Sequence, residues 1–391
     1  HSLIKHGVLM QQLILTFNVG SSSLKFSCYQ QEKPLFSLNI DLKQQQFLGQ
    51  GQFQIKNWTP SYHLADDACF IVDHIKTHYA PLNLIIAHRV VHGAEHQQAV
   101  MITPDILQEL EALSPLCPLH QPPALTVINA IQNKWPDIQQ IAAFDTSFHQ
   151  SQSRIARSFA LPKRLTSKGI KRYGFHGLSC QSIIGQLANT QRDKGRVIVA
   201  HLGNGSSITA IKDGVSQANS MSFSTLDGLP MGTRCGHLDA GVMLYLVEQG
   251  WTAQSLTELL YYQSGLLGLS GISSDMRVLM DSQETEAKFA IDYFVDYCAR
   301  TIAAMATTIQ GIDRLVFTGG IGEHQSTIRA NIVEHLTWLG LKINPQANEQ
   351  HSFIISTDDS TAELLCLPTN EQQQLFLAAK QLVKLSNDQE D

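Results

Sequence analysis

The chain of 391 residues carries 28 Lys and Arg against 34 Asp and Glu, so its formal net charge at pH 7 is -6. Hydrophobic residues make up 43% and charged residues 16%, a composition typical of globular proteins that excludes a disordered or collagen-like chain. The length predicts two or three domains. No apolar run approaches the roughly 20 residues of a membrane-spanning helix. The negative charge excludes a nucleic-acid binder held by a broad basic surface, so an anionic substrate would need a local cluster of cations.

The seven cysteines are scattered and form no C-x-x-C pair, so their spacing predicts neither a disulfide framework nor a zinc ribbon. Because no secretory signal is visible, we expect the reducing environment of the cytoplasm. Residues 1–9 fit neither a signal peptide nor a strand. We expect them to be an expression remnant, with the natural start near Met10.

Short β-like runs end at polar or glycine-rich corners along the whole chain. One group of three runs lies at 13–18, 24–29 and 35–40, and a second group lies at 196–201, 208–211 and from 215 onward. The same strand-turn-strand pattern therefore occurs twice. Copies this far apart predict two domains of similar build and not a short-period solenoid.

Strands alternate with helices in the rest of the sequence. Further β-like runs lie at 84–87, 141–144 and 315–317, and helical patterns lie at 64–78, 122–134, 286–310 and 370–385. This alternation predicts an α/β protein with mixed sheets. In such folds ligands bind where strands end. The predicted strand ends carry Asn18, Arg89, Asp145, His201 and Thr318.

Glycine-rich and serine-rich turns follow three of these strands and indicate a nucleotide site. Their backbone N–H groups can approach an anion closely, and Lys25 after the first turn adds a point charge for phosphate. A single such turn is usually only a turn, but the repetition favours a nucleotide. Neither the P-loop motif nor a complete G-x-G-x-x-G is present, so the site would be of another type.

Histidines and arginines near glycines are the other candidates. His88, His92 and His96 would form one metal-binding face if they lay on a helix, but β-like residues precede them and Gly93 interrupts the pattern. A zinc protein is therefore disfavoured and kept as an alternative. His176 and Arg234 lie in glycine-bracketed segments, and each alone fits a structural role equally well.

Eight motifs, in order over nearly the whole chain from Met10, resemble those of the acetate kinase (acetokinase) family. They are NVGSSSLK at 18–25, HRVVHG at 88–93, FDTSFH at 144–149, RYGFHG at 172–177, HLGNGSS at 201–207, MGTR at 231–234, FTGGIGE at 317–323 and PTNE at 368–371. A chance match of this extent is implausible.

The resemblance implies a duplicated actin-like (ribonuclease H-like) two-domain kinase fold with an interdomain active-site cleft. The expected domains are 10–147, with a C-terminal helix at about 375–391 packed on it, and a nucleotide-binding domain at 148–374. The implied reaction is reversible phosphoryl transfer from ATP to acetate, giving ADP and acetyl phosphate. The implied cofactor is Mg²⁺, or Mn²⁺ in its place. A homodimer is also implied, without nucleic-acid or membrane partners.

The family's catalytic roles transfer to single residues of this chain. The implied catalytic residues are Arg89, His120, Asp145, His176 and Arg234. Asn18 and Glu371 match the magnesium site, and Arg89 matches the residue that pairs with the carboxylate or acyl phosphate. His176 and Arg234 match the groups that stabilise the transition state. For Asp145 we expect a positioning and electrostatic role, because a carboxylate substrate is already ionised near neutral pH and needs no base.

The implied ATP-binding residues are Lys25, His201, Leu202, Gly203, Asn204, Gly205, Asp275, Met276, Arg277, Gly320, Ile321, Gly322, Glu323 and His324. The implied acyl-binding residues are Arg89, Val91, Leu119, Phe175 and Thr225. Thr225 stands where the family typically has proline, and His237, Ala240 and His324 also depart from the family's usual residues. A propionate or butyrate kinase therefore stays an alternative, since one methylene discriminates only ~10–200-fold. Acetate is the expected substrate because Val91 gives no sign of a larger pocket.

An actin-like ATPase without an acyl acceptor is the remaining alternative. It would bind or hydrolyse ATP without any carboxylate substrate. This alternative leaves Arg89, His176 and Arg234 without a role.

Overall fold

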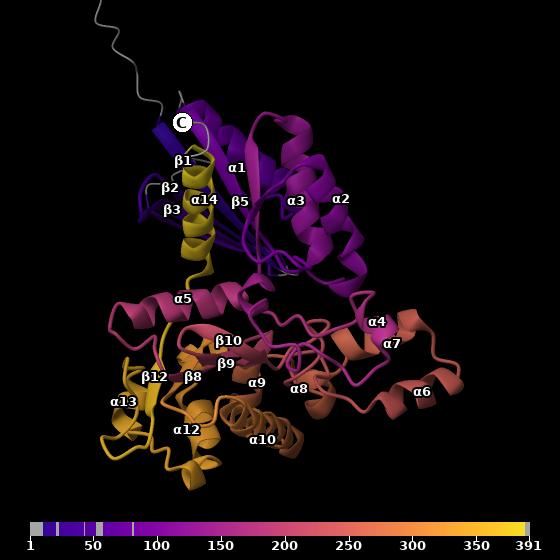
Figure 1. Ribbon diagram of the computed structural model, residues 1–391, viewed down its shortest axis with the longest axis vertical. Coiled ribbons are helices and arrows are strands. Elements are labelled where there is room, and N and C mark those ends of the chain that lie inside the picture. The colour runs from indigo at the N-terminus through magenta and orange to yellow at the C-terminus, as the bar shows by residue number, and fades with distance from the viewer. Residues whose placement is uncertain (1–10, 21–22, 43, 52–57, 80–81, 388–391) are drawn as a thin grey trace, which may run out of the picture. The chain divides into compact units, whose positions relative to one another are not determined.

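The computed structural model describes residues 11–20, 23–42, 44–51, 58–79 and 82–387 (Figure 1). The expected remnant at 1–9 lies outside the described residues, as do Ser21 and Ser22 of the first glycine–serine turn. The chain forms two compact units. The first unit comprises His1–Ser147 with Asn370–Asp391, and the second comprises Phe148–Thr369. Residues 370–374, expected in the second domain, belong to the first unit.

A seven-stranded mixed sheet forms the centre of the first unit, with strand order β4-β3-β2-β1-β5-β7-β6. Its strands are β1 (Gln11–Val19), β2 (Ser23–Tyr29), β3 (Pro34–Asp41), β4 (Gln46–Gly51), β5 (Leu82–Val90), β6 (Val100–Met101) and β7 (Gln139–Phe144). Strands β1 to β4 pair antiparallel, whereas β1, β5 and β7 run parallel. The carboxyl ends of β1, β5 and β7 therefore meet at one edge of the sheet.

Helices cover both faces of this sheet (Figure 1). The helices are α1 (Leu64–His78), α2 (Pro104–Ala112), α3 (Gln121–Lys134) and α14 (Glu371–Asn387), with the 3-10 turn η1 (Ser114–Leu116). A second 3-10 turn, η2 (Ser147–His149), begins at the last residue of this segment of the first unit and continues into the second unit. Leu15 and Phe17 of β1 pack in one core with Ile71 of α1. Because side chains alternate along a strand, Asn18 lies on the opposite face. That face meets α14, whose first residue is Glu371.

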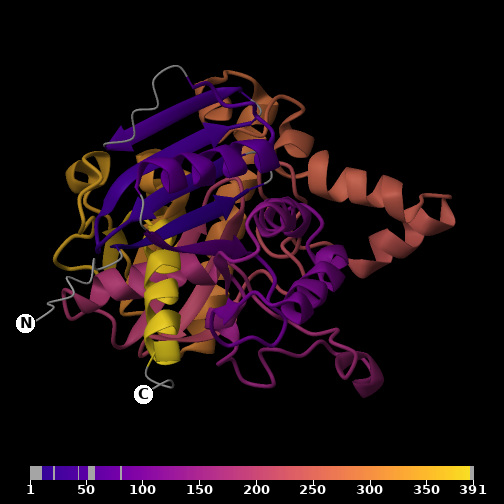
Figure 2. The ribbon, with the colours of Figure 1, turned by 90° about the horizontal axis from the view of Figure 1, so that it is seen from above.

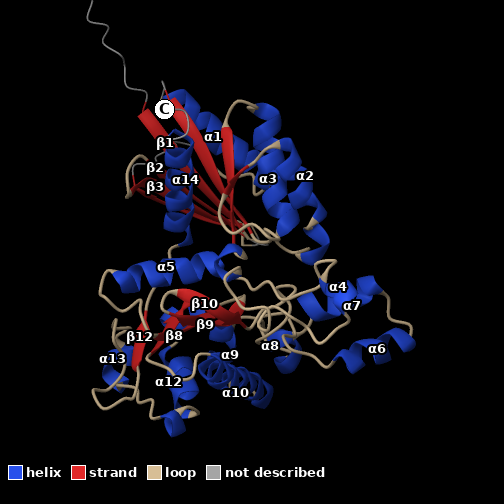
Figure 3. Ribbon diagram, viewed as in Figure 1, coloured by secondary structure: helices blue, strands red, loops and turns tan. Residues whose placement is uncertain are grey.

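The second unit is built around a five-stranded sheet with strand order β10-β9-β8-β11-β12. Its strands are β8 (Arg196–Leu202), β9 (Ser206–Lys212), β10 (Val215–Asn219), β11 (Arg314–Thr318) and β12 (Glu363–Cys366). One face packs on the long helix α10 (Thr285–Thr308), where Ile198 meets Phe294 and Cys298 in one core. The other face packs on α5 (Gly177–Ala188), where Val197 shares a core with Ile183 (Figure 3).

The two sheets repeat one topology, which confirms the predicted duplication. In the first unit, three antiparallel strands β3-β2-β1 continue into the parallel strands β5 and β7, and in the second unit β10-β9-β8 continue into β11 and β12. The strands and helices expected from the sequence are present, and α10 ends at Thr308, two residues before the expected end.

Short helices that the sequence analysis did not predict complete the second unit. They are α4 (Lys163–Thr166), α6 (Ala240–Glu248), α7 (Ala253–Tyr262), α8 (Gly265–Ser270), α9 (Met276–Asp281), α11 (Gly319–His324), α12 (Ser326–Glu334), α13 (Pro345–Glu349) and the 3-10 turn η3 (Thr337–Leu339). The seven cysteines, all in the described part of the chain, form no disulfide bond. Within the described ranges, no helix has the length and apolar character needed to cross a membrane.

Candidate active site

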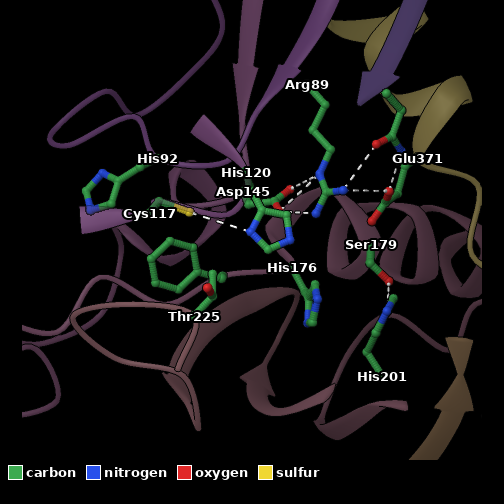
Figure 4. A network of polar contacts seen from close by, with 12 residues as sticks. Arg89, His92, Cys117, His120, Asp145, His176, Ser179, His201, Thr225 and Glu371 are labelled. Atoms are coloured by element: carbon green, nitrogen blue, oxygen red, sulfur yellow. Dashed lines mark hydrogen bonds and ion pairs between the residues drawn. The ribbon is translucent and has the colours of Figure 1, made fainter. Parts of the chain in front are cut away.

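Arg89, near the carboxyl end of β5, is the centre of a charged cluster in the first unit (Figure 4). Its Nη2 donates to Oδ2 of Asp145 at 2.5 Å, its Nε lies 3.2 Å from both oxygens of that carboxylate, and its Nη1 donates to Oδ1 of Asn18 at 3.1 Å. Glu371 Oε2 lies 3.8 Å from Nη1 and accepts from Nδ2 of Asn18 at 2.6 Å. Four predicted site residues therefore meet in this cluster.

The strand register explains why these residues meet. Asn18 is the penultimate residue of β1, Arg89 is the penultimate residue of β5, and Asp145 directly follows β7. These three strands are adjacent and parallel, so their polar ends share one sheet edge. Burial alone would lower the pKa of Arg89, but Asp145 and Glu371 outweigh it and the pKa lies above its usual range. The guanidinium is therefore permanently charged.

The other predicted residues of the first unit lie on neighbouring segments. Lys25 is exposed on β2, and Val91 is buried immediately after β5. Leu119 and His120 are half-buried in the turn before α3, and His120 Nδ1 lies 3.9 Å from Sγ of Cys117. Their site roles stay predictions.

The three histidines of the metal alternative do not lie on one helical face. His88 is in strand β5, where its Nε2 donates to Oε1 of Gln140 at 2.7 Å and its ring stacks on Phe17. His96 Nε2 instead lies 3.2 Å from a carboxylate oxygen of Glu109. Among the residues that the structure describes, no group of three or more His, Cys, Asp or Glu side chains is placed to hold a metal ion.

In the second unit, the predicted site residues gather around the glycine turn between β8 and β9. A Cβ atom at Gly205 would lie 2.9 Å from Nη2 of Arg234 and 3.3 Å from Nε2 of His176. A Cβ at Gly203 would lie 3.8 Å from the backbone nitrogen of Gly320. The turn therefore needs small residues, because two side chains with cationic or hydrogen-bonding nitrogens approach its backbone closely.

His176 is held by its backbone conformation and by its ring contacts. Its φ of 58° is left-handed, which is uncommon for a residue with a side chain. Nδ1 lies 2.9 Å from Oγ of Ser207, and the ring stacks on His201 with centroids 4.1 Å apart. His201 is fixed in turn by Oγ of Ser179 at 2.8 Å (Figure 4). Ser179 was not predicted from the sequence, because nothing in its local pattern marks the contact with His201.

Arg234 and Thr225 are joined by a hydrogen bond. Arg234 Nη1 donates to the backbone oxygen of Thr225 at 2.7 Å, and both residues are buried. The Thr225 hydroxyl is itself buried and has no hydrogen-bond partner among the described residues. Burying a hydroxyl without a hydrogen-bond partner is unfavourable. An apolar side chain at this position would therefore be buried at a lower cost in free energy than threonine. Phe175, the other predicted acyl-pocket residue of this unit, is fully buried.

The predicted ATP-binding residues differ in which of their atoms are available to a ligand. Leu202 and Met276 are buried in the hydrophobic core, so only their backbone groups are available to a ligand. Asp275 caps α9 and pairs with the exposed Arg277, with Oδ2 2.6 Å from Nη2. Glu323 accepts the backbone N–H of Gly319 at 3.0 Å. Its Oε1 atom therefore stabilises the first residue of helix α11.

The remaining residues of the predicted ATP-binding stretches lie in helix α11 and in the glycine turn between β8 and β9. Ile321 packs against the core, and His324 is exposed beside Glu323. A Cβ at Gly232 would lie 3.1 Å from the backbone oxygen of Ser274 and 3.8 Å from Oδ1 of Asn204. The segment before α9 therefore approaches the glycine turn through Gly232. Gly322 packs against the end of β11.

The comparison with known proteins identifies the family. The acetokinase family model matches residues 13–377. The chain belongs to the acetokinase family. It is 41% identical to an acetate kinase of Rickettsia felis over 386 residues, covering 96% of this chain and 100% of that protein. It is 39% identical to an acetate kinase of Methylocella silvestris over 392 residues, covering 93% and 96%.

A solved structure of the family has the same fold. The crystal structure of a propionate kinase from Francisella tularensis superposes with a TM-score of 0.87 at 34% identity, and the match covers 95% of this chain and 99% of that one. This likeness confirms the predicted α/β kinase fold. The motifs quoted from the sequence are thus those of a true family member.

The oxygen atoms of Asn18 and Glu371 fit the Mg²⁺ that the family implies. Mg²⁺ is a hard cation that takes oxygen ligands, and it is commonly held by one or two carboxylates together with substrate phosphates and water. This pair supplies one carboxylate and one amide oxygen, with Asn18 Nδ2 turned toward Glu371. The donor chemistry fits Mg²⁺ and not a soft metal that needs thiolates.

Three buried histidines predict that the free energy of unfolding decreases as the pH is lowered. Burial lowers the pKa of His88, His92 and His149 to about 4, whereas an unfolded histidine has a pKa of about 6.5. Below pH 6.5 the unfolded chain therefore binds protons that the folded chain does not. We expect the free energy of unfolding to fall by up to about 4 kcal/mol per pH unit between about pH 6 and 5.

Urea unfolding at closely spaced pH values measures this slope. His88→Asn should reduce it by about a third, because one of the three groups is removed. His237→Gln, at a histidine whose ring is 69% exposed, is the matched control and should leave it unchanged. A urea midpoint that stays constant from pH 6.5 to 5 would contradict the buried neutral histidines.

Proposed function

We propose that the chain is an acetate kinase that transfers the γ-phosphoryl group of ATP reversibly to acetate. The observation that carries the proposal is the Arg89 cluster in a member of the acetokinase family. It sets a fixed, charged guanidinium at the sheet edge where α/β folds bind ligands. The 41% identity to an acetate kinase over the length of both chains supports the same substrate.

Arg89 would bind the carboxylate of acetate or the phosphoryl group of acetyl phosphate. A guanidinium has five N–H groups. Three of them donate to Asp145 and Asn18, which leaves one N–H on Nη1, whose nitrogen lies 3.8 Å from Oε2 of Glu371, and one N–H on Nη2. These two N–H groups suit a planar, two-oxygen ligand. Asp145 and Asn18 thus orient the guanidinium and leave part of it for the substrate.

The chemical step requires no base. An acetate oxygen attacks the γ-phosphorus as the bond from that phosphorus to the β,γ-bridging oxygen breaks, and ADP leaves. Acetate is ionised near neutral pH, so no proton has to be removed. We therefore assign Asp145 the role of holding Arg89. The three hydrogen bonds that Asp145 accepts from the guanidinium, the shortest at 2.5 Å, support this assignment.

In the second unit, Arg234 and His176 would stabilise the charge of the transferring group. That charge is spread over three equatorial oxygens in the transition state. Nη2 of Arg234 and Nε2 of His176 both approach the backbone of Gly205. Preorganised donors of this kind stabilise developing charge without having to reorganise. The glycine turn and the backbones of Gly320 and Gly322 would bind ATP.

Asn18 and Glu371 would hold the Mg²⁺ of the nucleotide. When bound, the ion neutralises charge on the phosphate oxygens. Lys25, exposed on the strand next to Asn18, is available for a phosphate contact.

Acetate is the proposed acid substrate. Propionate is the second candidate, because two specific observations favour it. The Francisella tularensis structure is that of a propionate kinase, and Thr225 puts a buried hydroxyl where the family usually has proline. The curated relatives at 39% and 41% identity are acetate kinases, whereas the propionate kinase structure is 34% identical. We therefore place acetate first.

The decisive experiment is acyl phosphate formation from MgATP with acetate, propionate and butyrate in parallel, trapped as the hydroxamate. We expect the highest kcat/KM with acetate. One methylene changes kcat/KM by about 10–200-fold, so the three acids are well separated. Highest efficiency with propionate or butyrate would change the named substrate and put Thr225 at the centre of its explanation.

Two arginine variants provide the controls for this assay. Arg89→Ala and Arg234→Ala should each lower kcat/KM by roughly 10³–10⁵-fold while the chain stays folded. Arg154→Ala removes an exposed arginine of the second unit and should retain wild-type activity. ATP hydrolysis without any acyl phosphate would contradict the proposal and favour an actin-like ATPase.

We also propose that two copies of the chain form a homodimer through helices α6 and α7. Helix α6 has no buried residue, although its sequence is mostly apolar, and α7 lies beside it (Figure 2). The exposed fraction is 68% for Leu244, 59% for Tyr245 and 54% for Val247, and Tyr262 of α7 is 45% exposed. Exposed apolar side chains gathered on two neighbouring helices are typical of a surface that is covered by another protein. A second copy is the partner that is always present.

Light scattering after size exclusion measures the mass directly. We expect twice the chain mass for the wild type and a shift toward the single-chain mass for Leu244→Lys, because a charge would be buried at the interface. Ile155→Lys changes an apolar side chain that is 90% exposed elsewhere in the second unit and should stay dimeric. A wild-type chain with the mass of one copy would contradict the proposed dimer.

A further inference from the structure

The segment that leads into His176 has an unfavourable backbone conformation. Gly174 has φ 83° and His176 has φ 58°, so two of three consecutive residues are left-handed. Glycine tolerates this conformation, but histidine does so only when its surroundings enforce it. The left-handed turn sets the direction in which the His176 ring leaves the backbone. Something in the second unit must therefore hold this turn.

Two buried side chains hold Phe175, the residue between the two left-handed positions. Oδ1 of Asn219 accepts the Phe175 N–H at 3.2 Å, and Nδ2 of Asn219 donates to the Phe175 oxygen at the same distance. Nε2 of His149 donates to that oxygen at 2.7 Å. Both backbone groups of Phe175 are thus bound by side chains from η2 and the end of β10.

Further contacts fix both side chains. Asn219 Nδ2 also donates to Oγ1 of Thr209 at 2.7 Å, and Nδ1 of His149 lies 2.8 Å from Oγ of Ser216. Because the Phe175 oxygen can only accept, His149 Nε2 carries the proton and Nδ1 accepts from the Ser216 hydroxyl. Burial lowers the pKa of His149, which keeps the ring in this neutral form.

The packing leaves no space for the turn to relax. A Cβ at Gly174 would lie 2.8 Å from Cγ of His149 and 3.1 Å from Cβ of Asn219, so both side chains press directly on the turn. His149 is fully buried, and Asn219 is nearly so. At the other end of the turn, His176 reaches Ser207 and the glycine turn at Gly205.

We propose that Asn219 and His149 are positioning residues for phosphoryl transfer, which fix the Phe175 backbone so that the His176 imidazole faces the glycine turn beside Arg234. This inference rests on the proposed function, in which His176 stabilises the transferring group. Neither residue touches the substrate. They act by holding the His176 ring in position, because a displacement of about 1 Å can lower the rate on the order of 100-fold.

Matched variants separate hydrogen bonding from packing. His149→Met removes the donor to Phe175, whereas His149→Gln can place an amide N–H near the position of Nε2. Asn219→Leu removes all its hydrogen bonds at similar size, and Asn219→Asp keeps the acceptor of the Phe175 N–H. Gln217→Ala, on the same strand, is the control, because the Gln217 side chain donates to the backbone oxygen of Val215 and not to Phe175.

We expect His149→Met and Asn219→Leu to lower kcat for acyl phosphate formation by about 10–100-fold, with KM for ATP and for the acid changed less than about twofold. His149→Gln should recover most of this loss. Asn219→Asp should recover only a part of it, because its second carboxylate oxygen would face the Phe175 oxygen, and Gln217→Ala should match the wild type. If His149→Met or Asn219→Leu does not fold, the partial losses in His149→Gln and Asn219→Asp carry the same comparison.

Combination with His176→Ala distinguishes positioning from a general effect on the fold. If His149 acts through His176, His149→Met should cause no further loss of kcat in the His176→Ala background. Equal losses in both backgrounds, or a wild-type kcat in His149→Met and Asn219→Leu, would overturn the inference and leave the proposed function intact. A wild-type chain that forms no acyl phosphate would overturn the proposed function and this inference with it.

Discussion

The ion pair between Arg89 and Asp145 is the constraint on which the first unit's site depends. Asp145 is completely buried, and a buried carboxylate without a cation would cost several kcal/mol. Arg89 provides that cation at 2.5 Å, and the parallel pairing of β5 with β7 brings the two residues together. Asn18 and Glu371 complete the charge balance from β1 and α14. The pair therefore leaves a charged guanidinium whose remaining N–H groups can face a ligand.

The second unit has the same topology, but glycines and not an ion pair shape its candidate site. Here the strand ends carry glycines, and the close approach of Arg234 and His176 to Gly205 requires that no Cβ be present. The antiparallel strand pair β1–β2, which carries Asn18 and Lys25 in the first unit, thus corresponds to the pair β8–β9 in the second unit, whose connecting turn carries Gly203 and Gly205. The duplication gives one scaffold, and the two units carry different residues at corresponding positions of it.

The sequence predicted the strand ends well because an apolar run that stops at a polar residue is a local signal. Asn18, Arg89 and Asp145 were found in this way, and adjacent parallel strands then brought them together. Glu371 came only from the family resemblance, since its partners are more than 200 residues away. Ser179 and Asn219 were missed because their contacts to His201 and Phe175 span 22 and 44 residues and leave no local pattern. Helix α6 was missed because all of its residues lie outside the core, so no amphipathic period marks it.

We propose that Asp145 serves the reaction by holding Arg89 and not by moving a proton. A double-mutant cycle on kcat/KM for acetate tests this role, with Asp145→Asn, Arg89→Ala and the double variant compared with the wild type. We expect the double variant to be about as slow as Arg89→Ala alone, because Asp145 then has nothing to hold. Losses that multiply in the double variant would show instead that Asp145 acts independently of Arg89.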